Sequence, residues 1–175
     1  MSVHYSSDEA QAHAVFEALL GAMSRPGEAG TLPQSGLLQF VDTLIDLDTT
    51  THNCAADLRP AIVASRTRLV ALEMAEHVFA ADAQEAAALA AQLCVGEALY
   101  PDLGATLYVA CPHQGQRLRL SGPGIQTTVQ IETGLSAAFW QARNQACTYP
   151  AGFEVVVVDG ARLLAIPRST KVEVL

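Results

Sequence analysis

The spacing of apolar residues predicts a long amphipathic helix near the start of the chain. Over residues 6–23 the apolar positions recur at steps of three and four, which places them on one face of a helix. Ser6 and Glu9 have the spacing of a capping box, in which each side chain accepts a hydrogen bond from a backbone N–H at the helix start. The Arg-Pro-Gly sequence at 25–27 should end this helix, because proline has no N–H donor and glycine tolerates positive φ.

The rest of the first half contains shorter and less regular patterns. They predict, in order, an extended piece at 31–33, a helix near the start of 37–47, a buried strand at 77–82 and an Ala-rich helix at 84–93. The helix at 37–47 leads into an acidic and polar stretch. Residues 57–74 fit either a helix or strands, because Pro60 interrupts their apolar pattern, and both alternatives stay open at this point.

Beyond Gly96 the pattern changes to short strands separated by glycine and proline. Runs of this kind at 105–111, 116–120 and 127–131 predict an antiparallel portion of the fold. Residues 135–146 have apolar positions at helical spacing and predict one more helix, which should stop before the Tyr-Pro-Ala-Gly sequence that follows.

The last part of the chain predicts a central strand and a hairpin. Four successive valines at 155–158 are typical of a strand that is buried on both faces. The Asp-Gly pair at 159–160 predicts a tight turn, with a return strand at 162–167. Strands interleaved with helices, together with a hairpin, indicate an α/β fold with a mixed β-sheet flanked by helices. The absence of a repeat or composition break predicts a single domain over residues 1–175.

Composition and charge exclude several classes of partner. The chain has 10 Lys and Arg against 18 Asp and Glu and no basic cluster, which argues against nucleic acid. No apolar run reaches the roughly 18 residues that cross a bilayer, and the first residues do not resemble an export signal, so we expect a cytoplasmic protein without membrane contact. The four cysteines are far apart in sequence, and we interpret them as reduced and mostly buried.

Motifs for cofactor binding are incomplete. The LSGPGI sequence at 120–125 has Thr127 where a dinucleotide fingerprint has its third glycine, and we interpret it as a glycine-rich turn. The single lysine, Lys171, follows Thr170 rather than a glycine, so it does not form a P-loop. Its place near the end of the sequence also argues against a pyridoxal phosphate Schiff base. No cofactor is therefore expected.

Catalytic and metal motifs are equally weak. The five histidines include no pair at ligand spacing on one helix, and Ser136 lacks the second glycine of a nucleophile elbow. Asp102, within a Pro-Asp-Leu-Gly sequence, fits a β-turn better than an acid or base. Asp46 and Asp48 fit a solvated helix end better than a metal site. The sequence predicts no catalytic residue and no metal ligand.

Two arginines remain as candidate contacts for an anion or a partner protein. Arg25 and Arg168 each lie beside a proline-defined bend, and Ser169 and Thr170 follow Arg168 directly. A guanidinium with two hydroxyls can bind phosphate or phosphonate oxygens, but the same groups can bind a partner's carboxylate or the chain's own carbonyls. For Arg168 the structural or interface use and the ligand contact both stay open.

Five sequence blocks, in this order and spacing, resemble the H subunit of bacterial carbon-phosphorus lyase. The blocks are FEALLGAMSRPG (16–27), PDLGATL (101–107), RLRLSGPGI (117–125), YPAGFEVVVVDGARLLAIPR (149–168) and STKVEV (169–174). Together they span nearly the whole chain, whereas residues 54–76 do not align convincingly with the family. The resemblance implies a subunit of the complex that acts in phosphonate catabolism.

The resemblance also implies partners and a role. The G, H, I and L proteins of that system are associated with transfer of a ribose triphosphate from ATP to an alkylphosphonate with release of adenine, and the I protein is the expected seat of that chemistry. The expected partners are the G, I and J subunits, the last an iron-sulfur radical protein, and isolated H subunits form homodimers. We therefore expect a non-catalytic, interface-forming subunit. The alternative is a ligand-binding or catalytic component that contacts ATP or phosphonate through Arg168.

The fold implied by the resemblance is similar to the large domain of pyridoxal-phosphate transferases without the cofactor site. That agrees with the independent argument from the single lysine, Lys171.

Overall fold

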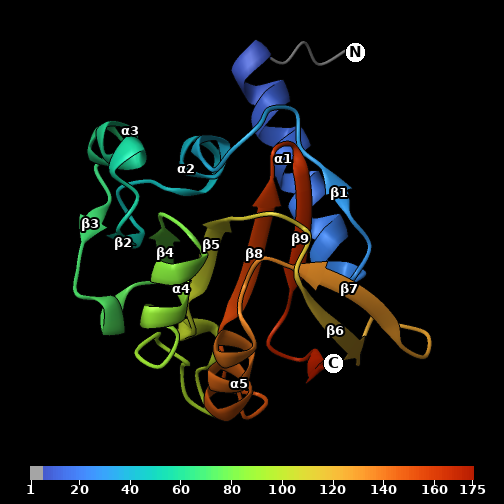
Figure 1. The fold of residues 1–175 in the computed structure, drawn as a ribbon. Helices are drawn as coiled ribbons and strands as arrows, with labels where there is room; N and C mark the ends of the chain where they lie inside the picture. Colours follow the sequence, from blue (N-terminus) through green and yellow to red (C-terminus); the bar gives the residue numbers. More distant parts are fainter. Residues whose placement is uncertain (1–5) are drawn as a thin grey trace.

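A computed structural model describes residues 6–175, in which the strands form two sheets (Figure 1). The larger sheet has seven strands in the order β1-β9-β8-β5-β4-β2-β3, and the smaller has three in the order β10-β6-β7. The strands are β1 (Gly30–Thr31), β2 (Thr50–Asn53), β3 (Arg68–Leu69), β4 (His77–Ala80), β5 (Thr106–Ala110), β6 (Gln116–Ser121), β7 (Val129–Thr133), β8 (Glu154–Asp159), β9 (Arg162–Ile166) and β10 (Lys171–Val174).

The larger sheet is mixed, as the sequence predicts. Strand β8 pairs in parallel with β5, where Val157 is opposite Val109, and antiparallel with β9, where Val157 is opposite Leu164. The parallel pairs continue from β5 to β4, β2 and β3, whereas β1 runs antiparallel to β9. The predicted hairpin at Asp159 and Gly160 is confirmed, with Gly160 at φ 62°.

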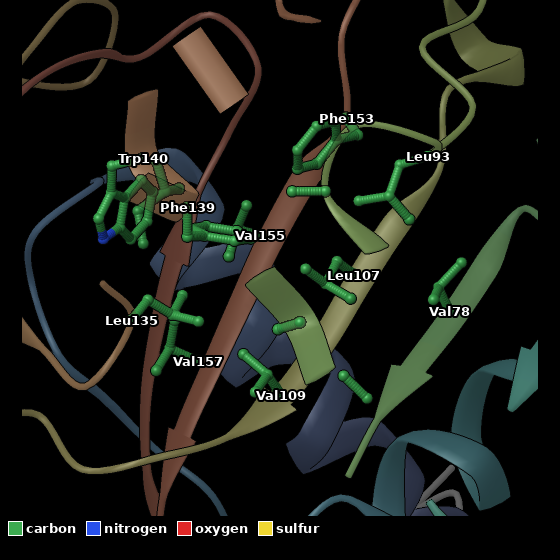
Figure 2. Packing of buried hydrophobic residues seen from close by; sticks show 14 of the residues in the cluster. Val78, Leu93, Leu107, Val109, Leu135, Phe139, Trp140, Phe153, Val155 and Val157 are labelled. Atoms are coloured by element: carbon green, nitrogen blue, oxygen red, sulfur yellow. The ribbon is translucent and has the colours of Figure 1, made fainter. Parts of the chain in front are cut away.

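Both faces of the larger sheet are covered, which confirms the prediction for the valine run. Val155 and Val157 point into one apolar cluster, and Val156 and Val158 point into the other. Figure 2 shows the first cluster, where Trp140 and Phe139 pack near Val155. The helices are α1 (Ser7–Ser24), α2 (Leu38–Leu44) and α3 (Arg59–Ala64) on the second cluster's side, and α4 (Ala83–Leu89) and α5 (Ala137–Ala146) on the first; short 3-10 helices are η1 (Ala56–Leu58), η2 (Leu72–Met74) and η3 (Pro101–Leu103).

The capping box predicted for α1 is present. The Glu9 backbone N–H donates to Ser6 Oγ at 3.2 Å, and the Ser6 backbone N–H donates to Glu9 Oε2 at 2.8 Å. The helix ends at Ser24, next to the predicted Arg-Pro-Gly stop.

Replacing Ser6 with alanine should lower the free energy of unfolding by about 1 kcal/mol, because the Glu9 N–H loses its acceptor. Urea denaturation measures this change. Ser7→Ala is the matched control, because it removes a hydroxyl from the adjacent exposed position without touching the cap, and should change stability by less than about 0.5 kcal/mol. Equal effects of the two substitutions would contradict the capping role.

Several predicted elements need correction. The run at 105–111 is not part of an antiparallel portion, because β5 lies between β4 and β8 and is parallel to both. The antiparallel sheet instead pairs β6 with β7 and with β10. The polar stretch after α2 contains β2, whose Thr51 bonds the Thr67 hydroxyl at 2.9 Å. The open stretch 57–74 contains both helix and strand.

The sequence Pro-Asp-Leu-Gly at 101–104 forms a 3-10 turn. Its backbone conformation does not require a glycine at position 104. Gly104 has φ −68°, which any residue adopts. A side chain at Gly104 would instead overlap the carbonyl oxygen of Gly152. The close approach of these two loops is therefore what requires glycine.

Candidate functional site

The predicted contact residues Arg168, Ser169 and Thr170 form a turn that is one of the connections between the two sheets. This turn follows β9 of the larger sheet and leads directly into β10 of the smaller one. The Thr170 N–H donates to the Pro167 carbonyl at 2.9 Å, which closes the turn. The rigid ends of two strands therefore fix the position of these side chains.

Arg168 binds groups of the chain itself. Its Nε donates to Glu154 Oε1, its Nη1 donates to the Pro101 carbonyl, and its backbone N–H donates to Glu154 Oε2 at 2.5 Å. The side chains of Arg168 and Glu154 are only 15% and 13% exposed. This ion pair links the start of β8, the turn at 101–104 and the turn before β10.

A cavity of about 310 Å³ lies between the end of α5 and the turn before β10. Its lining residues are Arg143, Asn144, Cys147, Tyr149, Arg168, Ser169, Thr170, Lys171 and Val172. Three of these are cationic, and none of the described residues that line it is Asp or Glu. In a chain with a formal net charge of −8, this is a local concentration of positive charge.

Arg143 is one of the residues of this cavity that the sequence did not identify as a candidate contact. It is 2% exposed, and it donates to the Pro167 carbonyl at 2.7 Å and the Thr170 carbonyl at 3.0 Å. Burial lowers the pKa of the guanidinium, while the neighbouring Cys147 and Glu154 act in the opposite direction. The available signal was its position four residues after Phe139, on the apolar face of the predicted helix.

Arg25 does not line this cavity. Its Nε lies 3.1 Å from Glu28 Oε2, and both side chains are mostly exposed. The glycine-rich turn at 121–125 lies between the two predicted contact regions, since Gly122 approaches the Ser169 carbonyl and Gly124 approaches the Ser24 carbonyl. The structure therefore groups Arg168, Ser169 and Thr170 and leaves Arg25 apart.

The described part of the chain contains no group of three or more His, Cys, Asp or Glu side chains that could hold a metal ion. Within residues 6–175, no helix combines the length and the apolar composition that a bilayer crossing requires.

Comparison with known proteins places the chain in a family. A family model described as bacterial phosphonate metabolism protein (PhnH) matches residues 3–173, almost the whole chain. The chain belongs to the PhnH family. This result confirms the resemblance that the five sequence blocks indicate, and with it the assignment to phosphonate metabolism.

Two curated relatives are similar to this chain over most of their length. HtxG of Stutzerimonas stutzeri, named as a C-P lyase subunit protein, is 31% identical over 169 residues, which cover 90% of this chain and 83% of that protein. The PhnH subunit of alpha-D-ribose 1-methylphosphonate 5-triphosphate synthase from Rhizobium meliloti (strain 1021) is 28% identical over 183 residues, which cover 93% of this chain and 90% of that protein.

Proposed function

We propose that this chain is an interface-forming subunit, without a catalytic site of its own, of a cytoplasmic carbon-phosphorus lyase complex. In this role it supports transfer of a ribose triphosphate from ATP to an alkylphosphonate with release of adenine. The observation that carries the proposal is the family match over residues 3–173, together with relatives that are both named as subunits. The proposed partners are the G, I and J subunits, with a homodimer when the chain is isolated.

Exposed apolar side chains on two neighbouring loops support an interface role. Leu99 is 83% exposed and Tyr149 is 72% exposed, and Tyr100 and Leu103 are at least half exposed. The loops are joined where the Gly152 N–H donates to the Val95 carbonyl at 2.7 Å. Large apolar groups that remain in water on ordered loops are typical of protein contact sites. We name Leu99, Tyr100, Leu103 and Tyr149 the loop surface.

Co-expression with the G, I and J subunits tests the proposal. The chain should copurify with them as a stable complex, and failure to do so at low salt would contradict the subunit role. The double substitution L99D/Y149D should weaken assembly at least tenfold, roughly the effect of losing about 1.4 kcal/mol at an apolar contact. Leu47→Asp is the matched control, because Leu47 is 62% exposed and lies before β2, outside the two loops. Loss of assembly in the control alone would assign the contact to another surface.

The second candidate function is a component that contacts ATP or phosphonate through Arg168. The positive charge of the cavity around Arg168 favours it. The internal contacts of Arg168 with Glu154 and Pro101 favour the structural role instead. A variant that loses turnover while the complex still assembles would support the ligand contact.

The proposal extends to the fold as a whole. We place residues 1–175 in a single domain that is similar to the large domain of pyridoxal-phosphate transferases without the cofactor site. The mixed sheet with helices on both faces supports this comparison.

A further inference from the structure

We propose that the edge of the larger sheet at α3 and β3 is a second docking surface, which binds an extended segment of a partner subunit that carries both acidic and apolar side chains. We name Arg59, Val63, Arg66, Arg68 and Leu69 the arginine surface. The inference deepens the proposed function and rests on it for the identity of the partners. It adds a charged contact, which the apolar loop surface does not provide.

Positive charge is concentrated on the arginine surface. Residues 59–68 contain three of the ten Lys and Arg of the chain and no Asp or Glu, although the formal net charge of the whole chain is −8. The three arginines are exposed, and none forms an ion pair with a carboxylate among the residues that the structure describes. Their guanidinium groups make a single hydrogen bond within residues 6–175, from Arg68 Nη2 to the Asp48 carbonyl at 3.2 Å. Guanidinium groups left unpaired in this way bind carboxylates of a partner and steer an acidic segment toward this edge.

Arg66 occupies a backbone position where glycine is usual. It follows Ser65, the C-cap of α3, and has φ 62°, which among the described non-glycine residues is the single positive value. A Cβ is disfavoured in this left-handed region, so helices commonly have glycine or asparagine at this point. The Arg66 side chain is exposed and forms no ion pair within the described part of the chain that would offset the cost. A strained residue without an internal contact is expected where the side chain serves a contact outside the fold.

Apolar groups lie beside the arginines. Val63 and Leu69 are each 59% exposed. A cavity of about 300 Å³ separates α3 from the edge strands, and it is lined by Thr51, His52, Asn53, Arg59, Ile62, Val63, Leu69 and Val70. The cavity provides room for apolar side chains of a segment whose carboxylates contact the arginines.

The backbone of β3 is open on its outer side. This strand is the last in the order of the larger sheet, and Figure 1 shows it on the far side of β2 from β4. The Arg68 N–H donates to the Thr49 carbonyl at 3.1 Å. The Val70 N–H donates to the Thr51 carbonyl, also at 3.1 Å. Because backbone groups of successive residues point to opposite sides of a strand, the N–H and C=O of Leu69 face away from β2 and are available to an extended segment.

The shortness of β3 makes the arginines necessary for binding. The strand has only two residues, Arg68 and Leu69, so backbone pairing alone holds a segment weakly. Binding at this surface should therefore depend strongly on charge and weaken as salt rises.

Charge reversal in the co-expressed complex tests this dependence. The double substitution R59E/R68E should weaken assembly with the G, I and J subunits at least about tenfold and reduce its sensitivity to salt. The matched control is R117E/R162E, which reverses two exposed arginines on β6 and β9. The control should change assembly by less than about twofold.

Arg66→Asn separates binding from folding. Asparagine adopts the left-handed region more readily than arginine, so the variant should unfold at a urea concentration no lower than that of the native chain. It should nevertheless weaken assembly about two- to fivefold, the effect of losing one exposed charge pair, and Arg66→Lys should restore most of the loss. Assembly of Arg66→Asn equal to that of the native chain would contradict the role of Arg66.

A second assay tests the surface without an assembled complex. Overlapping peptides that cover the G, I and J sequences are immobilised and probed with the full native chain and with the R59E/R68E variant. The native chain should bind peptides that combine Asp or Glu with apolar residues, and the variant should not bind them.

Two results would overturn the arginine surface. One is an array in which no acidic peptide binds the native chain better than the R59E/R68E variant. The other is a complex in which R59E/R68E assembles as well as the R117E/R162E control. A native chain that binds such a peptide but does not copurify with the G, I and J subunits would contradict the proposed function and leave the surface supported.

Discussion

Replacing Arg168 with alanine should lower the free energy of unfolding by about 3–5 kcal/mol, because the substitution leaves the Glu154 carboxylate largely buried without its partner. The Pro101 carbonyl also loses its donor, which disconnects the turn at 101–104 from the turn before β10. Urea denaturation of the purified chain measures the change.

Arg162→Ala is the matched control for this prediction. Arg162 is an exposed arginine on β9, so its loss should change stability by less than about 0.5 kcal/mol. The double substitution E154Q/R168Q should recover part of the stability, because it removes both charges of the pair. Equal stability of the Arg168→Ala and Arg162→Ala variants would contradict a structural role for Arg168.

The double substitution also separates the two functional interpretations of Arg168. If Arg168 is structural, the double variant should regain assembly with the G, I and J subunits and also turnover. If Arg168 contacts ATP or phosphonate, the double variant should assemble while turnover stays lost. The alanine variant alone does not separate them, because a destabilised chain loses both.

Replacing Gly124 with alanine is expected to cost about 2–5 kcal/mol. Gly124 has φ 80°, where an L side chain costs about 1–2 kcal/mol, and a Cβ there would overlap the Ser24 carbonyl oxygen and lie 2.9 Å from Pro26 Cδ. Relief of this overlap requires a shift of the backbone at the end of α1, and overpacking of this kind costs roughly 1–3 kcal/mol more. Thermal or urea denaturation measures the sum.

Gly36→Ala isolates the packing contribution. Gly36 has φ 89°, close to the value at Gly124, but a Cβ at Gly36 would meet nothing within 4 Å. The control should therefore show only the conformational cost of about 1–2 kcal/mol. A Gly124→Ala variant no less stable than the control would show that the glycine-rich turn and the end of α1 do not pack as described.

Elements that depend on local signals were predictable from the sequence. The capping box of α1 involves residues three apart, and the turn between β8 and β9 involves an adjacent Asp-Gly pair. Strands β2 and β10 were missed for a different reason. The first consists of four polar residues, and it is held by pairing with β3 and β4, which no local pattern reveals. Strand β10 is short and charged, and it exists through pairing with β6.

The candidate site was also predictable only where its residues are adjacent in the sequence. The sequence identifies Arg168, Ser169 and Thr170, because they are adjacent and follow a proline. It does not identify Arg143, since the helix brings that side chain to carbonyls of the turn that lie 24 and 27 residues further along the chain. It also places Arg25 in the same class as Arg168, although the structure gives Arg25 an exposed pair with Glu28 and gives Arg168 a largely buried pair with Glu154.

The order of strands in the two sheets has a consequence for synthesis on the ribosome. Strands β8, β9 and β10 come last among the described elements, yet β8 lies between β5 and β9 within the larger sheet, β9 pairs with β1 from the start of the chain, and β10 completes the smaller sheet. A nascent chain that ends before residue 154 therefore lacks β8 and β9, the two strands that lie between β5 and β1 in the larger sheet. At about 5–20 residues per second, residues 154–174 are synthesised within seconds, and until they join the fold β5 lacks its partner strand β8 and α1 lacks the strand β9 that it packs against.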